Sequence, residues 1–151
     1  MSDPTSFTLK TTPKMDVVAQ EIVRLYPRSI TTEAMAKAAR EAHKTVDVQS
    51  DAFDATAKNL DNAAAAYAST SQTLCTKLDE LFGLAKEENS SLFPRKTSEV
   101  TWENHLSATR AAETQLKTSL NEFLLKTAQQ EKIGALPTDG QYFDTNQSIK
   151  R

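Results

Sequence analysis

Four aspartates near the middle of the chain have the residue type and the spacing that a divalent cation site or a general acid–base pair could use. They recur at helical intervals and would share one face of a helix: Asp47, Asp51, Asp54 and Asp61. Lysines alternate with these acids along the same face, at Lys44 and Lys58. Cation sites in helical bundles instead combine carboxylates from several helices with histidine. We therefore interpret the acids as a solvated face, and the sequence predicts no metal ligand.

The other side chains with catalytic chemistry are two histidines and one cysteine. His43 and His105 are far apart in the chain and form no motif of defined spacing. Cys75 has no glycine-containing nucleophile loop around it, so we expect a small buried or half-buried residue inside a helix. With only three glycines in the chain, no run of glycines could cradle a phosphate. The sequence therefore predicts no catalytic or cofactor-binding residue, and a function other than catalysis.

Charge and hydropathy indicate which kinds of partner molecule and which compartment we expect for this chain. The 18 lysines and arginines are mixed with 20 aspartates and glutamates, so no basic patch for nucleic acid is expected. No window has the roughly 18 apolar residues of a membrane span, and the first residues lack the apolar segment of a secretion signal. The single cysteine fits a reducing compartment, so we expect a cytoplasmic protein. Export by a route that needs no signal peptide stays open.

Scarcity of glycine and a long stretch without proline favour helix throughout. We predict an all-α protein, either an antiparallel helical bundle or an extended helical hairpin, built on one long central helix. Proline marks the two main internal breaks, at Pro27 and Pro94. The expected organisation is a flexible N-terminal tail at 1–12, a helical domain at 13–132 with helices at about 13–26, 31–88 and 98–132, and a flexible C-terminal tail at 133–151.

Two helix starts carry specific signals. Thr12 is the expected cap of the first helix, with Pro13 at the first helical position. Thr31 is the expected cap of the second, flanked by Ile30 and Met35 at the two ends of a hydrophobic staple.

The predicted central helix contains a single column of apolar residues at heptad spacing. Its members are Ala39, Val46, Phe53, Leu60, Tyr67, Leu74 and Leu81. The positions three and four residues further on are mostly small or polar, unlike the two apolar columns of a leucine zipper. We therefore expect a coiled-coil-like seam that other helices approach closely.

Residues 62–75 are small on nearly every side of the helix, because four consecutive alanines are followed by hydroxyl side chains. Ala64 is expected on the seam side, and Ala65 on the charged side, where a second helix would cover it. Two architectures satisfy this pattern. Either the long helix breaks near 68–73 to give a four-helix bundle, or other chains complete the layer.

The expected function is a non-enzymatic protein–protein interaction or scaffold subunit that packs with partner helices or with copies of itself. The alternative is a self-contained four-helix bundle acting as a bacterial exported or secretion-associated factor. The predicted interface residues are Val46, Phe53, Leu60, Ala64, Ala65, Tyr67, Leu74 and Trp102. Trp102 also fits a core position, and the aromatics Tyr142 and Phe143 fit either a docking motif or a tail that packs back on the helices.

Overall fold

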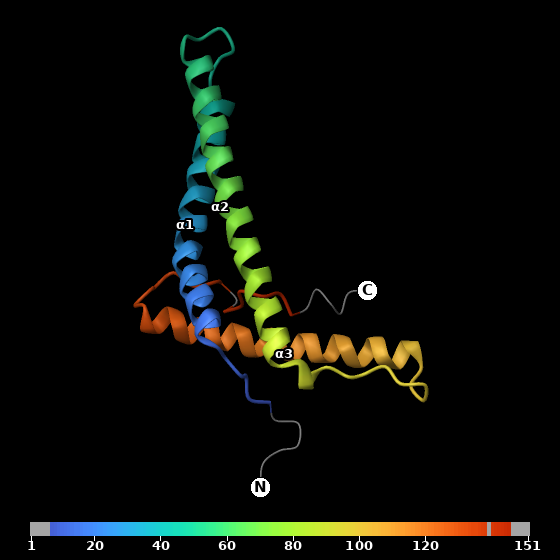
Figure 1. Cartoon of the computed structure of the whole chain (residues 1–151). Helices are drawn as coiled ribbons and strands as arrows, with labels where there is room; N and C mark the ends of the chain where they lie inside the picture. The colour runs from blue at the N-terminus through green and yellow to red at the C-terminus, as the bar shows by residue number, and fades with distance from the viewer. Residues whose placement is uncertain (1–6, 139, 146–151) are drawn as a thin grey trace.

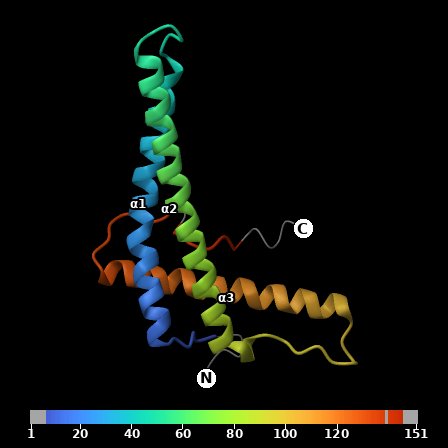
Figure 2. The same ribbon diagram turned by 45° about the horizontal axis from the view of Figure 1, so that its top comes forward.

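The structure is a computed structural model that describes residues 7–138 and 140–145 of the 151-residue chain. It consists of helices and the segments that connect them. In these residues there are three α-helices, α1 (Pro13–Lys44), α2 (Ala52–Glu88) and α3 (Trp102–Gln130), one 3-10 helix, η1 (Ser90–Leu92), and no strand. Helices α1 and α2 form an antiparallel hairpin, and α3 lies crosswise against its open end (Figure 1; Figure 2). The predicted all-α class is confirmed.

The single long helix predicted over 31–88 is wrong. The chain leaves the helix after Lys44 and begins α2 at Ala52, whereas the break considered near 68–73 is absent, because α2 is continuous there. The first predicted helix, 13–26, is too short, since α1 runs through Pro27. The described residues therefore hold three α-helices, not the four of the alternative bundle.

Hydrogen bonds from side chain to backbone explain the turn at residues 45–51. The Asp47 carboxylate accepts from the Gln49 backbone N–H at 3.0 Å, and the Ser50 hydroxyl accepts from the Ala52 N–H at 3.2 Å. The Asp47 carbonyl also accepts from the Ser50 N–H at 2.9 Å. Such local bonds give the backbone an alternative to the helix, and here they end one helix and start the next.

Packing on both sides keeps α1 helical through Pro27. A proline in a helix interior costs about 3 kcal/mol, because it lacks the N–H and crowds the preceding turn. Before Pro27, Ile22 and Val23 are fully buried; beyond it, the Tyr67 hydroxyl of α2 donates to Glu33 at 3.2 Å. Thr31, the predicted cap of a new helix, instead donates its hydroxyl to the Pro27 carbonyl at 3.1 Å. Tertiary contacts therefore outweigh the local signal.

The caps of the other helix ends are specific. Thr12 accepts from the Met15 N–H at 3.2 Å, which confirms the predicted start of α1. The cap of α3 is Thr101, which accepts from the Asn104 N–H at 3.1 Å, so this helix starts four residues later than the predicted 98. At its C-terminal end Lys132 adopts the left-handed conformation, φ 59°, that closes a helix.

The core lies where α3 crosses the hairpin. Leu116, Leu120 and Leu124 of α3 are fully buried there against residues from the start of α1 and the end of α2. The buried cluster consists of Met15, Val18, Ala19, Ile22, Val23, Leu81, Ala85, Leu116, Leu120, Leu124, Ala128 and Phe143. The crossing therefore holds most of the hydrophobic stabilisation.

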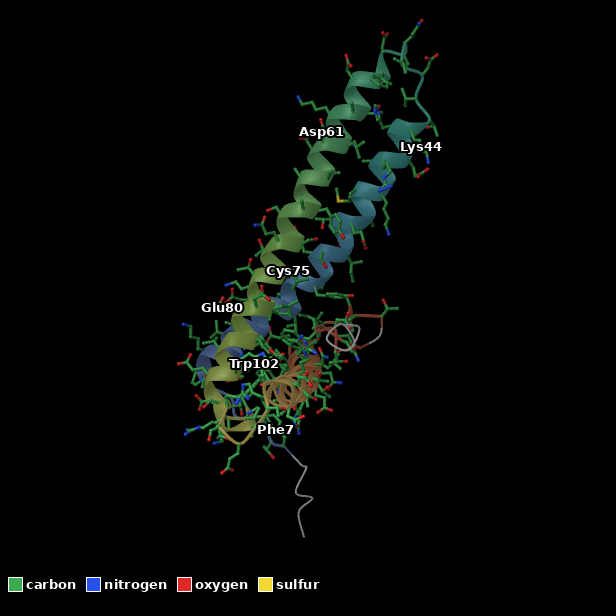
Figure 3. All side chains as sticks on the ribbon, turned by 90° about the vertical axis from the view of Figure 1, so that its right-hand side faces the viewer. Phe7, Lys44, Asp61, Cys75, Glu80 and Trp102 are labelled. Atoms are coloured by element: carbon green, nitrogen blue, oxygen red, sulfur yellow. The ribbon has the colours of Figure 1, made fainter. Side chains whose placement is uncertain are left out.

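Beyond the crossing the hairpin continues as a two-helix projection, residues 28–70, which we call the arm. At about 1.5 Å per residue, α1 extends roughly 25 Å from Arg28 to Lys44. Figure 3 shows Lys44 and Asp61 on the arm, far from Phe7, which packs against the core at the crossing. Of residues 24–80, all of which are described, only Ala39 is buried.

Both predicted tails are in part packed on the helices. Phe7 and Leu9 pack against the core from the N-terminal side, and Ile133, Tyr142 and Phe143 from the C-terminal side. The ordered structure therefore extends beyond the predicted domain bounds of 13 and 132. The remaining parts of the two predicted tails, 1–6 and 146–151, lie outside the described residues.

If the crossing carries the stability, Leu120→Ala should lower the free energy of unfolding by about 2 to 5 kcal/mol, through lost burial and the cavity left behind. The matched control Leu136→Ala, at a side chain that is 39% exposed, should cost about 1 kcal/mol or less. Urea denaturation followed by circular dichroism measures both. Equal losses would place the core elsewhere.

Candidate functional site

The seam of the arm is closed by polar as well as apolar contacts. Near the apex the His43 and Phe53 rings lie 4.7 Å apart, and His43 Nδ1 is 2.8 Å from the Thr56 hydroxyl. At mid-arm the Tyr67 hydroxyl bonds to Glu33. Between the arm and the crossing, Lys77 of α2 pairs with Glu21 of α1 at 2.9 Å, a hydrogen bond that raises the pKa of the lysine. These contacts set the register of α1 against α2.

A groove runs along one side of the arm between its two helices. Its volume is about 290 Å³. It is lined by Glu33, Ala36, Lys37, Arg40, Leu60, Ala64 and Tyr67. The floor combines the small side chains Ala36 and Ala64 with the half-buried Leu60 and Tyr67, so backbones on both sides can be approached closely.

The charges at the groove belong to α1. Glu33 already has two partners, the Tyr67 hydroxyl and Lys37 at 3.9 Å. Arg40 is exposed and forms no ion pair with any residue that the structure describes. An anionic group brought to this groove would therefore meet a cation that is not neutralised within the described part of the chain.

The predicted interface residues fall into three groups. Phe53, Leu60, Tyr67 and Leu74 are half-buried along the seam. Ala64 and Ala65 are both exposed, and Ala64 borders the groove between the two helices; Ala63 is half-buried. Val46 lies in the turn at 45–51 and is outside any helix, because the chain leaves the helical path before it.

Trp102 is 61% exposed at the first position of α3, so its reading as a core residue is wrong. Its ring lies 5.6 Å from that of His105, whose Nδ1 is enclosed and has no hydrogen-bond partner among the described residues. The same part of α3 borders an open hollow of about 650 Å³ that includes Leu106 and Arg110. This surface is separate from the arm.

Two buried asparagines hold the terminal segments of the described chain. Asn121 of α3 donates to the Phe143 carbonyl at 3.0 Å and accepts from the Phe143 N–H at 2.7 Å. Asn89 binds Lys10 in the same way, at 3.0 Å and 2.8 Å. Each carboxamide therefore pairs with both peptide groups of one residue, as a neighbouring strand would. The sequence analysis missed both residues, because a single asparagine has no spacing signature.

Tyr142 lies against α1 with its ring 5.5 Å from that of Tyr26. Its hydroxyl is enclosed and finds no hydrogen-bond partner among the residues described. Burial of the hydroxyl, together with the proximity of Tyr26, raises the pKa of Tyr142 to about 12. The neutral phenol is thus the form that fits the folded segment.

The side chains first considered for chemistry do not converge. Cys75 is exposed, which corrects its expected burial, and Asp47, Asp51 and Asp54 face solvent as expected. In the described parts of the chain, no three His, Cys, Asp or Glu side chains gather in a group that could hold a metal ion. Nor does any helix there have the length and apolar character that crossing a membrane requires.

Comparisons of the chain with protein-family models, with curated proteins and with solved structures found no match. The arm groove and the asparagine-held segments are therefore judged by their own geometry.

The enclosed Tyr142 hydroxyl predicts a change at high pH. The folded pKa lies above the ordinary value of 10.0, so the stability from this group is complete below pH 10 and is lost as the pH rises towards about 12. Absorbance titration of tyrosinate should show a phase near pH 12 that Tyr142→Phe removes, while the control Tyr67→Phe retains it. Coincident curves for the wild type and Tyr142→Phe would contradict the burial.

Proposed function

We propose that this chain is a non-enzymatic protein–protein interaction or scaffold subunit whose arm packs with other helices in a larger assembly. The observation that carries the proposal is the incomplete layer of the arm. Its apolar seam residues Phe53, Leu60 and Tyr67 stay half-buried, although four leucines at the crossing are fully buried. Two packed helices leave one face of each without a neighbour, and a further helix is the usual way to cover it.

The groove suggests the chemistry of the partner. A partner helix with small or apolar side chains could lie against Ala36, Leu60 and Ala64, since small residues on the arm allow close approach of the two backbones. An acidic side chain on that helix would face Arg40. The proposed partner is therefore an amphipathic helix with an acidic edge, from another protein or from a second copy of the chain.

The exposed apolar side chains of the arm agree with this assignment. Met35 is 59% exposed on α1, and Ile30, five residues earlier, is 42% exposed. Isolated exposed residues are common on monomeric proteins, so these two only add to the argument from the incomplete layer.

Substitution at Ala64 tests the proposal. Because Ala64 is exposed, Ala64→Leu should leave the helical signal and the thermal midpoint of the monomer nearly unchanged. In an assembly the added methylenes would fill the groove, at an overpacking cost of about 1 to 3 kcal/mol, and weaken association roughly tenfold or more. Ala55→Leu is the matched control, since position 55 is exposed and lies on the opposite side of α2.

Two measurements read out association. Sedimentation equilibrium of the purified chain detects self-association, which Ala64→Leu should reduce and Ala55→Leu should not. If the chain is monomeric, a photo-reactive phenylalanine analogue at position 64 or 55 in cells detects another partner. A monomer that cross-links equally, or not at all, from the two positions would contradict the proposal.

A further inference from the structure

Residues 140–145 lie in a groove at the crossing and contact each of the three helices. Tyr142 packs against Tyr26 of α1, and Phe143 lies 6.3 Å, ring to ring, from Phe82 of α2. Asn121 of α3 bonds to the Phe143 backbone. Figure 1 shows this segment, in red, returning from the end of α3 towards the hairpin. A segment outside the helices thus occupies a site built by side chains from three separate helices.

We propose that this groove is a binding site for a peptide segment of a partner protein with two adjacent aromatic residues, and that the chain's own residues 140–145 occupy it until such a peptide displaces them. The site is at the crossing, so the proposal is independent of the function assigned to the arm.

Recognition of the backbone at this site does not depend on the sequence of the bound segment. The carboxamide of Asn121 is 5% exposed, and it uses its donor and its acceptor on the two peptide groups of one residue. Any residue with a free backbone N–H that adopts the backbone conformation of Phe143 could make the same pair of bonds. This pair of bonds therefore recognises the backbone, not a particular side chain.

Side-chain selectivity comes from the ring of the same residue, Phe143. Phe143 is 8% exposed and belongs to the core cluster, beside a Phe82 ring that also has the Lys117 ammonium 5.7 Å from its centre. A hollow of about 290 Å³ remains next to this segment, bordered by Leu78 and Cys75. The site thus accepts a phenylalanine and leaves space beside it that the present occupant does not fill.

The chain's own segment is an imperfect occupant because of Tyr142. Its enclosed hydroxyl loses its hydration and gains no hydrogen bond from any described residue. A peptide with phenylalanine at this position would keep the ring contact with Tyr26 without that penalty. The difference between tyrosine and phenylalanine at this position therefore favours the binding of the peptide over that of the resident segment.

A glycine turn precedes the segment. Gly140 adopts a left-handed conformation, φ 73°, in a turn whose N–H bonds to the Pro137 carbonyl at 2.9 Å. Glycine takes this conformation without steric cost, so the turn is a natural pivot between α3 and the bound residues. Release of the segment would break its bonds to Asn121 and the contacts of Phe143 with the core cluster, and an incoming peptide with the same aromatic residue would replace both.

Cys75 makes the proposal testable even for weak binding. It is the only cysteine of the chain, it is exposed, and it borders the same hollow as Asp144. A peptide with cysteine at the position of Asp144 should therefore form a disulfide with Cys75 when it occupies the groove. Thiol–disulfide exchange in a redox buffer, read by mass spectrometry, measures the fraction captured.

The host is the full chain carrying Phe143→Ala, which weakens the resident segment. Three synthetic hexapeptides are compared: Gly-Gln-Tyr-Phe-Cys-Thr, the same peptide with phenylalanine in place of tyrosine, and the same peptide with alanine in place of phenylalanine. We expect the Phe-Phe peptide to be captured most, and the alanine peptide roughly tenfold less or worse, since it lacks the buried ring. Asn121→Ala added to the host should lower the capture of all three peptides, whereas Asn104→Ala, at an exposed asparagine on the same helix, should not.

Equal capture of all three peptides, or capture unaffected by Asn121→Ala, would overturn the proposal, because Cys75 alone would then explain the reaction. The wild-type chain is a second host in case Phe143→Ala is unfolded. There, excess Phe-Phe peptide should raise amide hydrogen exchange at residues 141–145, and no change in exchange would count against displacement. A wild-type dimer that is lost in Asn121→Ala would also overturn it, in favour of segments exchanged between two copies.

Discussion

The structure depends on one constraint: the chain has few large apolar side chains, and nearly all that are fully buried meet at a single crossing. Leu116, Leu120 and Leu124 of α3 close over the start of α1 and the end of α2. With 38% hydrophobic residues in the whole chain, little remains to cover the rest of the hairpin. The small number of large apolar side chains explains both parts of the structure. Because most of them are buried at the crossing, the arm has only two helices and a half-buried seam.

The helical class and several of its details were accessible from the sequence, because they rest on local chemistry. The cap at Thr12 and the charged outer face are local patterns, and the structure has them. The position of the break was not found, since heptad periodicity continues across residues 45–51, where Val46 fits the column by spacing alone. The informative signal was the pair Asp47 and Ser50, whose side chains bond to nearby backbone. At Pro27 the sequence predicted a break that the structure does not have. Tertiary packing there outweighs the local preference of proline against a helix interior.

The candidate sites were predictable to different degrees. The column from Phe53 to Leu74 lies along the seam, as its spacing indicated. The exposure of Ala64 and Trp102 depends on which elements pack near them, and the spacing of residues in the sequence does not show this. The roles of Asn89 and Asn121 are long-range, since each pairs with a residue 79 or 22 positions away. One carboxamide holding one backbone residue requires a three-dimensional arrangement that periodicity does not encode.

The arm also implies a gradient of local stability along the molecule. Opening a helix near the crossing exposes fully buried leucines, whereas opening near the apex exposes Phe53 and breaks little beyond the contact of His43 with Thr56. The free energy of local opening should therefore decrease steadily from the crossing to residues 45–51. Fraying can begin at the apex while the crossing stays folded. A helix that binds along the arm would then stabilise both arm helices. It would slow amide hydrogen exchange most near the apex, where the free energy of local opening is lowest in the unbound chain.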